Sequence, residues 1–130
     1  MANSAVSFNG RVFLSTQAGF LLEEGSEGLR MTRDSNWSNI STISTGAAYY
    51  LYFSTSTPNS WKATTTKSLI GGVFDRTFSV NDVYRDGDDR ISPSGTLDPN
   101  TKKIDMTVSW WNGKATSTKA VIFYLTNLFN

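Results

Sequence analysis

Four aspartates close together in the stretch DVYRDGDDR are the residues best suited to hold a metal ion. They are Asp82, Asp86, Asp88 and Asp89. Clustered carboxylates are the ligands that calcium prefers, but an EF-hand has a glycine at its sixth loop position and ends in a glutamate, which this stretch does not. Arg85 and Arg90 are interleaved with the aspartates. We therefore favour a solvated hairpin loop, with calcium as the alternative and no other cofactor expected.

Two tryptophans, Trp61 and Trp111, are candidate ligand contacts, because flat aromatic faces stack on sugars and on the bases of single-stranded DNA. Core and sheet packing is the interpretation we favour for both. Lysines near the end of the chain could form a basic edge for DNA, namely Lys102, Lys103, Lys114 and Lys119. Lysines also protect strand edges from aggregation, and this second explanation is preferred.

The composition removes several classes of chemistry. The chain has 130 residues, no cysteine and no histidine, so it lacks disulfides, thiolate chemistry and the commonest general base. A formal net charge of +1 provides no general attraction for nucleic acid or acidic membranes. Since no nucleophile or phosphate-binding motif stands out either, we expect no enzymatic activity.

The elements that must position these residues begin with a helix expected over residues 4–34. One apolar stripe includes Leu21, Gly25 and Leu29, and a polar face lies roughly opposite. A second apolar stripe beside the first contains Val6, Phe13, Phe20 and Met31. One stripe is enough to cover a sheet, so the second predicts another contact surface; a flexible N-terminal tail is the alternative for Val6 and Phe13.

The helix accepts two internal glycines, Gly25 and Gly28, although each costs about 1 kcal/mol relative to alanine. Both belong to the first stripe. They predict that a sheet or a neighbouring backbone lies against the helix there with no side chain between. Fraying of the helix towards residue 33 is the alternative.

The rest of the chain, residues 47–130, reads as short strands and loops. Strands are expected at 47–53, 61–66 and 73–84, residues 85–102 as a long loop, and a closing hairpin after it. Asn112 and Gly113 are the expected turn. A two-residue turn would place Met106 opposite Lys119, and a three-residue turn would place it opposite Ala120. We predict one α+β domain over residues 1–130, with the helix on an antiparallel sheet of about four to six strands.

Three segments resemble bacterial type IV pilin-like proteins in the order in which that family has them. The first is LLEEGSEGLRMTRDSNWSNIS, the second is GVFDRTFSVNDVYRD, and the third is DPNTKKIDMTVSWWNGKATSTKAVIFYLTNLF. Together they run from about Phe20 to Asn130, so the resemblance covers most of the chain.

The resemblance implies a pilin-like fold in which the helix is a spine shared between subunits. Phe13 and Phe20 would then join subunits, and Leu21, Gly25 and Leu29 would pack on the sheet. The family's leader, processing site and apolar anchor helix are not present in the sequence. We expect an anchor segment ahead of residue 1 that ties the subunit to the membrane, and a soluble ectodomain at the cell surface.

The predicted function is therefore that of a minor pilin or pseudopilin, a structural subunit of a type IV pilus or a related secretion filament. Its partners would be other pilin subunits. The alternative is a cell-surface recognition module, adhesin-like, that binds glycans or DNA through exposed aromatic residues.

Overall fold

The computed structural model describes the backbone of residues 2–129 and the side chains of residues 10–129. A 34-residue helix, α1 (Ala2–Ser35), opens the chain, and a short helix, α2 (Ser38–Ser41), follows it. Six strands complete the order: β1 (Tyr50–Ser54), β2 (Ser60–Thr64), β3 (Asp75–Arg85), β4 (Ile91–Ser92), β5 (Thr96–Trp111) and β6 (Thr116–Thr126). The predicted α+β class is confirmed.

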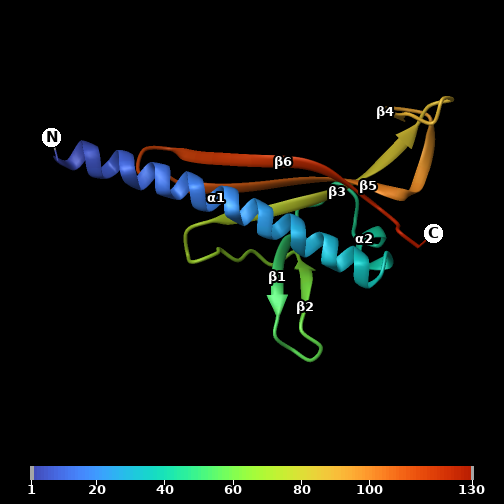
Figure 1. Ribbon diagram of the computed structural model, residues 1–130, viewed down its shortest axis with the longest axis horizontal. Coiled ribbons are helices and arrows are strands. Elements are labelled where there is room, and N and C mark those ends of the chain that lie inside the picture. The colour runs from blue at the N-terminus through green and yellow to red at the C-terminus, as the bar shows by residue number, and fades with distance from the viewer. Residues whose placement is uncertain (1, 130) are drawn as a thin grey trace.

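The strands form two antiparallel sheets rather than one. Strands β4, β3, β5 and β6 make a four-stranded sheet in that order, and β1 and β2 make a separate hairpin. Figure 1 shows the β1–β2 hairpin projecting to one side of α1, away from the four-stranded sheet. The helix therefore has two sheets to pack against.

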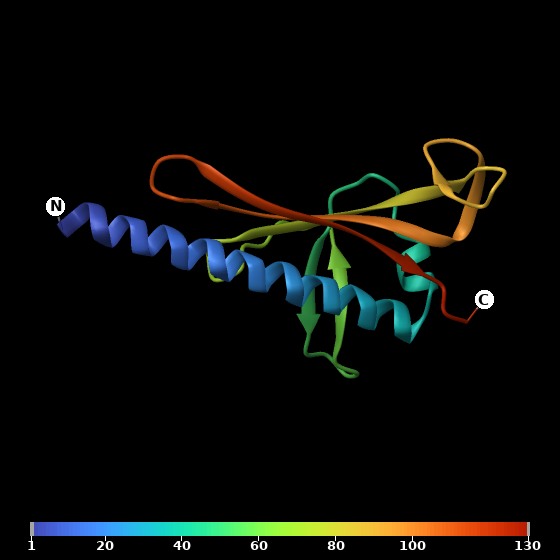
Figure 2. The same cartoon turned by 45° about the horizontal axis from the view of Figure 1, so that its top comes forward.

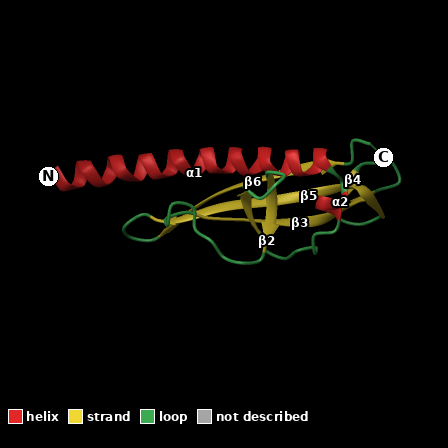
Figure 3. Cartoon of the chain, turned by 90° about the horizontal axis from the view of Figure 1, so that it is seen from below, coloured by secondary structure: helices red, strands yellow, loops and turns green. Residues whose placement is uncertain are grey.

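Helix α1 lies along one face of the four-stranded sheet. Figure 3 shows it above the strands, with its N-terminal turns extending past the turn between β5 and β6. The same overhang is visible after a 45° turn in Figure 2. The core lies between α1 and the sheet, where alternate residues of each strand point inward. Its largest fully buried side chains are Phe78, Leu29, Ile40, Ile104, Met106, Leu125, Val80 and Val108.

The segment expected to be a long loop is partly a strand. Strand β5 begins at Thr96 and pairs with the end of β3, Val83 with Asp98 and Arg85 with Thr96. The register shifts between Asp82 and Val83, because residues 99–101 of β5 have no partner on β3. Pro99, a loop signal in the sequence, falls in this irregularity, where a sheet tolerates proline.

Both predicted registers of the closing hairpin are wrong. Met106 pairs with Val121, and the last pair before the turn is Trp111 with Thr116. The loop between them consists of the four residues 112–115, whereas the longer of the two predicted turns has three. The side chain of Asn112 closes this loop. Its side-chain oxygen accepts hydrogen bonds from the backbone N–H groups of Lys114 at 2.9 Å and Ala115 at 3.0 Å.

Candidate functional site

Helix α1 has a buried face and an exposed face, and both carry residues singled out in the sequence. On the buried face, Leu29 is 1% exposed, and Ala18 and Leu22 are also buried. Leu21 is half-buried at the border and packs against the core. Because these residues recur at helical spacing, the sheet covers one continuous side of the helix.

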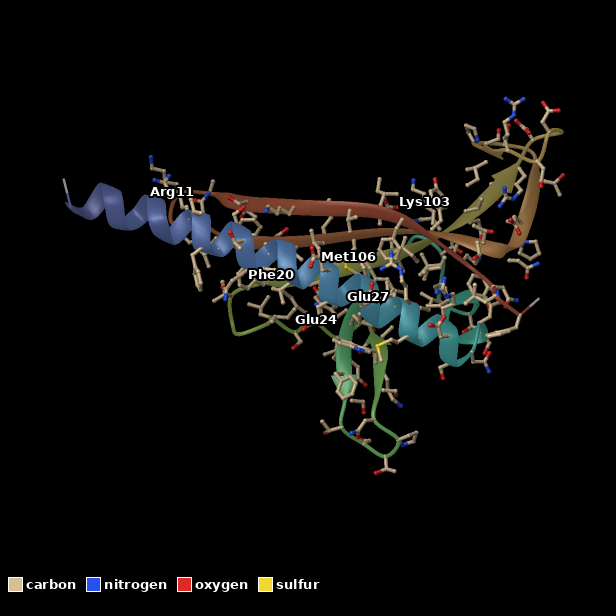
Figure 4. The ribbon with its side chains drawn as sticks, in the orientation of Figure 1. Arg11, Phe20, Glu24, Glu27, Lys103 and Met106 are labelled. Atoms are coloured by element: carbon tan, nitrogen blue, oxygen red, sulfur yellow. The ribbon has the colours of Figure 1, made fainter. Side chains whose placement is uncertain are left out.

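Gly25 lies against the four-stranded sheet. A Cβ built on it would be 2.7 Å from Sδ of Met106 on β5 and 3.2 Å from Cδ of Arg76 on β3. Figure 4 labels Met106 beside this part of the helix, near Glu24 and Glu27. The glycine therefore makes room for two side chains of the sheet.

Gly28 lies against the other sheet. A Cβ there would be 2.9 Å from Cδ2 of Trp61 on β2 and 3.0 Å from Cδ2 of Leu51 on β1. The predicted close approach exists at both glycines. The expectation that no side chain would intervene is wrong, because side chains of the two sheets fill the space that each missing Cβ leaves.

Arg76 joins the helix and both sheets. Its side chain points into the core, where its Nη1 donates to the carbonyl oxygen of Leu21 at 2.9 Å and to Oε1 of Glu24 at 2.8 Å. Its Nη2 donates to the carbonyl oxygen of Leu51 at 3.4 Å, and the guanidinium lies 5.8 Å from the ring centroid of Trp61. Sequence reasoning missed this role, although a charged residue that breaks the alternation of β3 was its signal.

The exposed face of α1 carries large apolar side chains. Phe13 is 61% exposed, Phe20 is 63% exposed and Met31 is 57% exposed. They lie on one stripe, since residues seven and eleven positions apart share a helix face. Figure 4 labels Phe20 on this side, away from Met106. We call Phe13, Phe20 and Met31 the outer stripe. Val6 lies outside the residues whose side chains the structure describes.

Two glutamates interrupt the outer stripe, and each has a cationic partner. Glu24 pairs with Arg76, and Oε1 of Glu27 accepts a hydrogen bond from Nη1 of Arg30 at 2.8 Å. The carboxylates on this face are therefore balanced by cations of the same chain.

An apolar groove borders the outer stripe beside Phe20. Its volume is about 410 Å³. The groove is lined by Gln17, Phe20, Leu21, Ile70, Gly71, Val73 and Phe74. Val73 is itself exposed, so apolar surface continues from the helix onto the loop before β3.

The four aspartates do not converge. Asp82 lies on β3 and accepts a 2.6 Å hydrogen bond from Nζ of Lys102, while Asp88 pairs with Arg90 at 2.6 Å. Asp86 accepts hydrogen bonds from the backbone N–H groups of Asp88 and Arg90, which closes the turn. Asp89 lies at the turn with a φ of 63°. Within the described part of the chain, no three acidic residues are grouped as metal ligands would be.

Next to this turn, Arg85 and Asp98 form a paired site between β3 and β5. Nε of Arg85 donates to Oδ2 of Asp98 at 2.7 Å. This hydrogen bond, together with one from the backbone N–H of Asn100, lowers the pKa of Asp98 below its ordinary value of 3.8. The pair holds the start of β5 against the end of β3.

The two candidate tryptophans have different surroundings. Trp61 is half-buried between Gly28, Arg76 and Phe53, and its ring is 5.4 Å from that of Phe53 in an edge arrangement. Trp111 is 62% exposed at the end of β5. Only Trp111 offers a largely free ring face.

Comparison of the chain with known protein families, with curated proteins and with solved structures finds no match. Among the described residues, neither helix is long and apolar enough to cross a bilayer. The functional argument therefore depends on the geometry of the chain itself, and above all on the two faces of α1.

Proposed function

We propose that this chain is a structural subunit of a type IV pilus or a related secretion filament, and that it assembles through the outer stripe of α1. The observation that supports the proposal is the exposure of Phe13, Phe20 and Met31 on a stripe of the helix beside its buried face. A helix that only covered its own sheet would be polar on its outer face. The resemblance described above adds the class of assembly and a place at the cell surface, among other pilin subunits.

The energetics favour burial of the outer stripe in an assembly. Burying one large apolar side chain contributes about 1.5–3 kcal/mol. Desolvation of the intervening glutamates opposes association less than it would for free charges, since Glu24 and Glu27 already have cationic partners. The N-terminal turns of the helix also extend past the sheet (Figure 3).

The test is a double variant, Phe13→Ser with Phe20→Ser, in the full-length protein in the cell that produces it. Filaments counted by electron microscopy should fall to a small fraction of the wild-type number. Ile91→Ser is the matched control, because Ile91 is also exposed but lies on β4, far from the helix. Normal filament numbers in the double variant, at normal protein levels, would refute the proposal.

A recognition role is the second candidate, and the exposed ring of Trp111 is what favours it. A glycan array and a single-stranded DNA binding assay on wild type and Trp111→Ala would detect such a role. Binding that depends on Trp111 would support recognition at the surface of a subunit. Absence of binding in both proteins would leave assembly as the proposed function.

A further inference from the structure

Other parts of the chain cover one edge of the four-stranded sheet and leave the other edge open. On the β3 side, Tyr49 exchanges two backbone hydrogen bonds of 2.9 Å with Phe78, and the N–H of Gly46 donates to the carbonyl of Val80 at 2.9 Å. Ile70 donates to the carbonyl of Phe74 at 2.8 Å, and β4 covers the end of the strand. The outer edge of β3 is therefore closed by the chain's own backbone.

The β6 edge is open. This strand is the last in the sheet order, so no other strand within residues 2–129 pairs with its outer side. In Figure 1 it forms the upper border of the molecule along most of its length. The strand runs for eleven residues along this border, and seven of them are exposed.

Strand β6 has few of the features that protect an edge strand. Such features are proline, bulges, very short strands and charged side chains, especially lysine. The pairing of β6 with β5 is continuous from Thr116 to Thr126, without a bulge. Its sequence, TSTKAVIFYLT, contains no proline or glycine and one charged residue, Lys119.

The hydrogen-bonding pattern shows which backbone groups point outward. The backbone N–H of Asn112 donates to the carbonyl of Ala115, and the N–H of Asn127 donates to the carbonyl of Asn100. The backbone N–H and C=O groups of odd-numbered residues of β6 therefore point towards β5. Along an antiparallel strand, successive residues direct these groups alternately to one side and to the other. The residues whose N–H and C=O point away from the sheet are therefore Thr116, Thr118, Ala120, Ile122, Tyr124 and Thr126.

We propose that β6 pairs antiparallel with β6 of a second copy of this chain, about a twofold axis at Val121, so that the two four-stranded sheets become continuous. Val121 is the middle residue of β6, so this register pairs the whole strand, Thr116 with Thr126 of the second copy. It also places Thr118 opposite Tyr124 of the second copy, a favourable combination of β-branched and aromatic side chains across strands. This interface lies on a surface other than the outer stripe and goes beyond the proposed function.

The charge pattern of β6 favours a second, antiparallel copy as the occupant. Lys119 is the one charged residue of the strand, and its Nζ lies against Gly19 of its own α1, 3.8 Å from the position of a Cβ. Gly19 lines a groove of about 490 Å³ between β6 and α1, together with Glu23, Glu27 and Arg30. The edge therefore carries no charge that repels a copy of itself, and the proposed register keeps the two Lys119 side chains four positions apart. A parallel, in-register pair would instead place the two Lys119 side chains together.

The test is the oligomeric state of the purified chain by sedimentation velocity across a range of concentrations. Wild type should form a dimer, and Ala120→Pro should remain monomeric, because it removes an outward N–H that β5 does not use and that an edge strand can lose. Ala120→Val is the matched control, since it keeps the N–H and should dimerise like wild type. Ile122→Lys, which adds a charge to the exposed edge, should also abolish the dimer. If Ala120→Pro fails to fold, the oligomeric state of Ile122→Lys is the test of the proposal.

Amide hydrogen exchange resolved by NMR gives an independent readout. In the dimer, the amides of the even-numbered residues from Thr118 to Tyr124 should exchange at least tenfold more slowly than in the Ile122→Lys monomer. The amides of Lys119, Val121 and Phe123 should be protected in both. A wild-type chain that stays monomeric, or a dimer that survives Ile122→Lys, would overturn the proposal. Filament loss in the Phe13 and Phe20 variant would still support the outer stripe, so the two ideas fail separately.

Discussion

Gly28 of α1 lies directly against the indole ring of Trp61, so that a Cβ on the glycine would be 2.9 Å from Cδ2 of the ring. Leu51 occupies the other side of the same space at 3.0 Å. The β1–β2 hairpin is thus held against the helix through a position that has no side chain. The hairpin belongs to a separate sheet, and it is held in place by this contact, by the hydrogen bond from Arg76 to the carbonyl of Leu51, and by the backbone pairing of Tyr49 with Phe78 just before β1.

Replacing Gly28 with alanine should lower the free energy of unfolding. The helix gains about 1 kcal/mol in propensity, but overpacking against a rigid ring costs about 1–3 kcal/mol. We expect a net loss in urea unfolding and a changed fluorescence of Trp61. Gly19→Ala is the control, because its nearest neighbour is Nζ of Lys119 at 3.8 Å, and it should stabilise the protein by about 1 kcal/mol. Equal stabilisation by both substitutions would contradict the close contact.

Arg76→Lys should lower the free energy of unfolding by about 2 kcal/mol, because a hydrogen bond to a charged group contributes about 1.5–3 kcal/mol. The planar guanidinium of Arg76 reaches the carbonyls of both Leu21 and Leu51, and a lysine ammonium cannot reproduce this arrangement. Glu24→Gln should cost less than about 1 kcal/mol, because Glu24 is half exposed and its ion pair is screened by water. Chemical denaturation of both variants measures the difference. A larger effect at Glu24 would mean that the ion pair, rather than the buried carbonyl contacts, holds Arg76 in place.

The long helix and the α+β class could be predicted because apolar residues recur every 3.6 residues in the helix and every two residues in the strands, a pattern that is local to each segment. The partners of Arg76 could not. Two of its acceptors are backbone carbonyls, of Leu21 and Leu51, which every sequence has at every position. Only the mutual placement of α1 and the β1–β2 hairpin brings them to the guanidinium.

The hairpin register was unpredictable for a related reason. The residues Asn112 and Gly113 were correctly identified as part of the turn, but the length of the loop depends on which backbone N–H groups the Asn112 side chain binds. It binds those of Lys114 and Ala115, and the loop lengthens accordingly. The outer stripe, in contrast, was visible in the sequence, since Phe13 and Phe20 stand on a face that the first stripe leaves free. Its role in assembly stays a prediction.

Acid should remove the stabilisation that the Arg85–Asp98 pair provides. The pKa of Asp98 is lowered in the folded protein, chiefly by the hydrogen bond from Arg85, and is close to 3.8 when the chain is unfolded. Between these two values the unfolded state binds more protons, so stability increases with pH in that window and is complete above it. We expect wild type to be more stable than Asp98→Asn at neutral pH, and the difference to shrink as the pH falls below about 4.

Urea unfolding of both proteins at several pH values measures this difference. Arg85→Gln is the control, because it keeps the carboxylate but removes the main cause of the shift. NMR titration should then find the pKa of Asp98 higher in Arg85→Gln than in wild type. A stability difference between wild type and Asp98→Asn that is independent of pH would show that Asp98 acts through packing alone.

Two adjacent tryptophans should respond in opposite ways to truncation, because β5 places them on opposite faces of the sheet. Trp110 is 6% exposed, faces the core and lies 6.1 Å from the ring of Phe74, whereas Trp111 faces solvent. Trp110→Ala should lower the free energy of unfolding by about 3–5 kcal/mol, and Trp111→Ala should change it by less than about 0.5 kcal/mol.

Trp110→Phe refines this comparison. Nε1 of Trp110 is buried and has no hydrogen-bond partner among the described residues, so phenylalanine removes an unsatisfied donor as well as part of the ring. The loss should therefore be clearly smaller than for alanine, since leaving a buried polar group unpaired costs about 1–3 kcal/mol. Thermal unfolding of the three variants tests the assignment of faces. A large loss in Trp111→Ala would mean that this ring packs in the fold, and it would remove the observation that favours a recognition role.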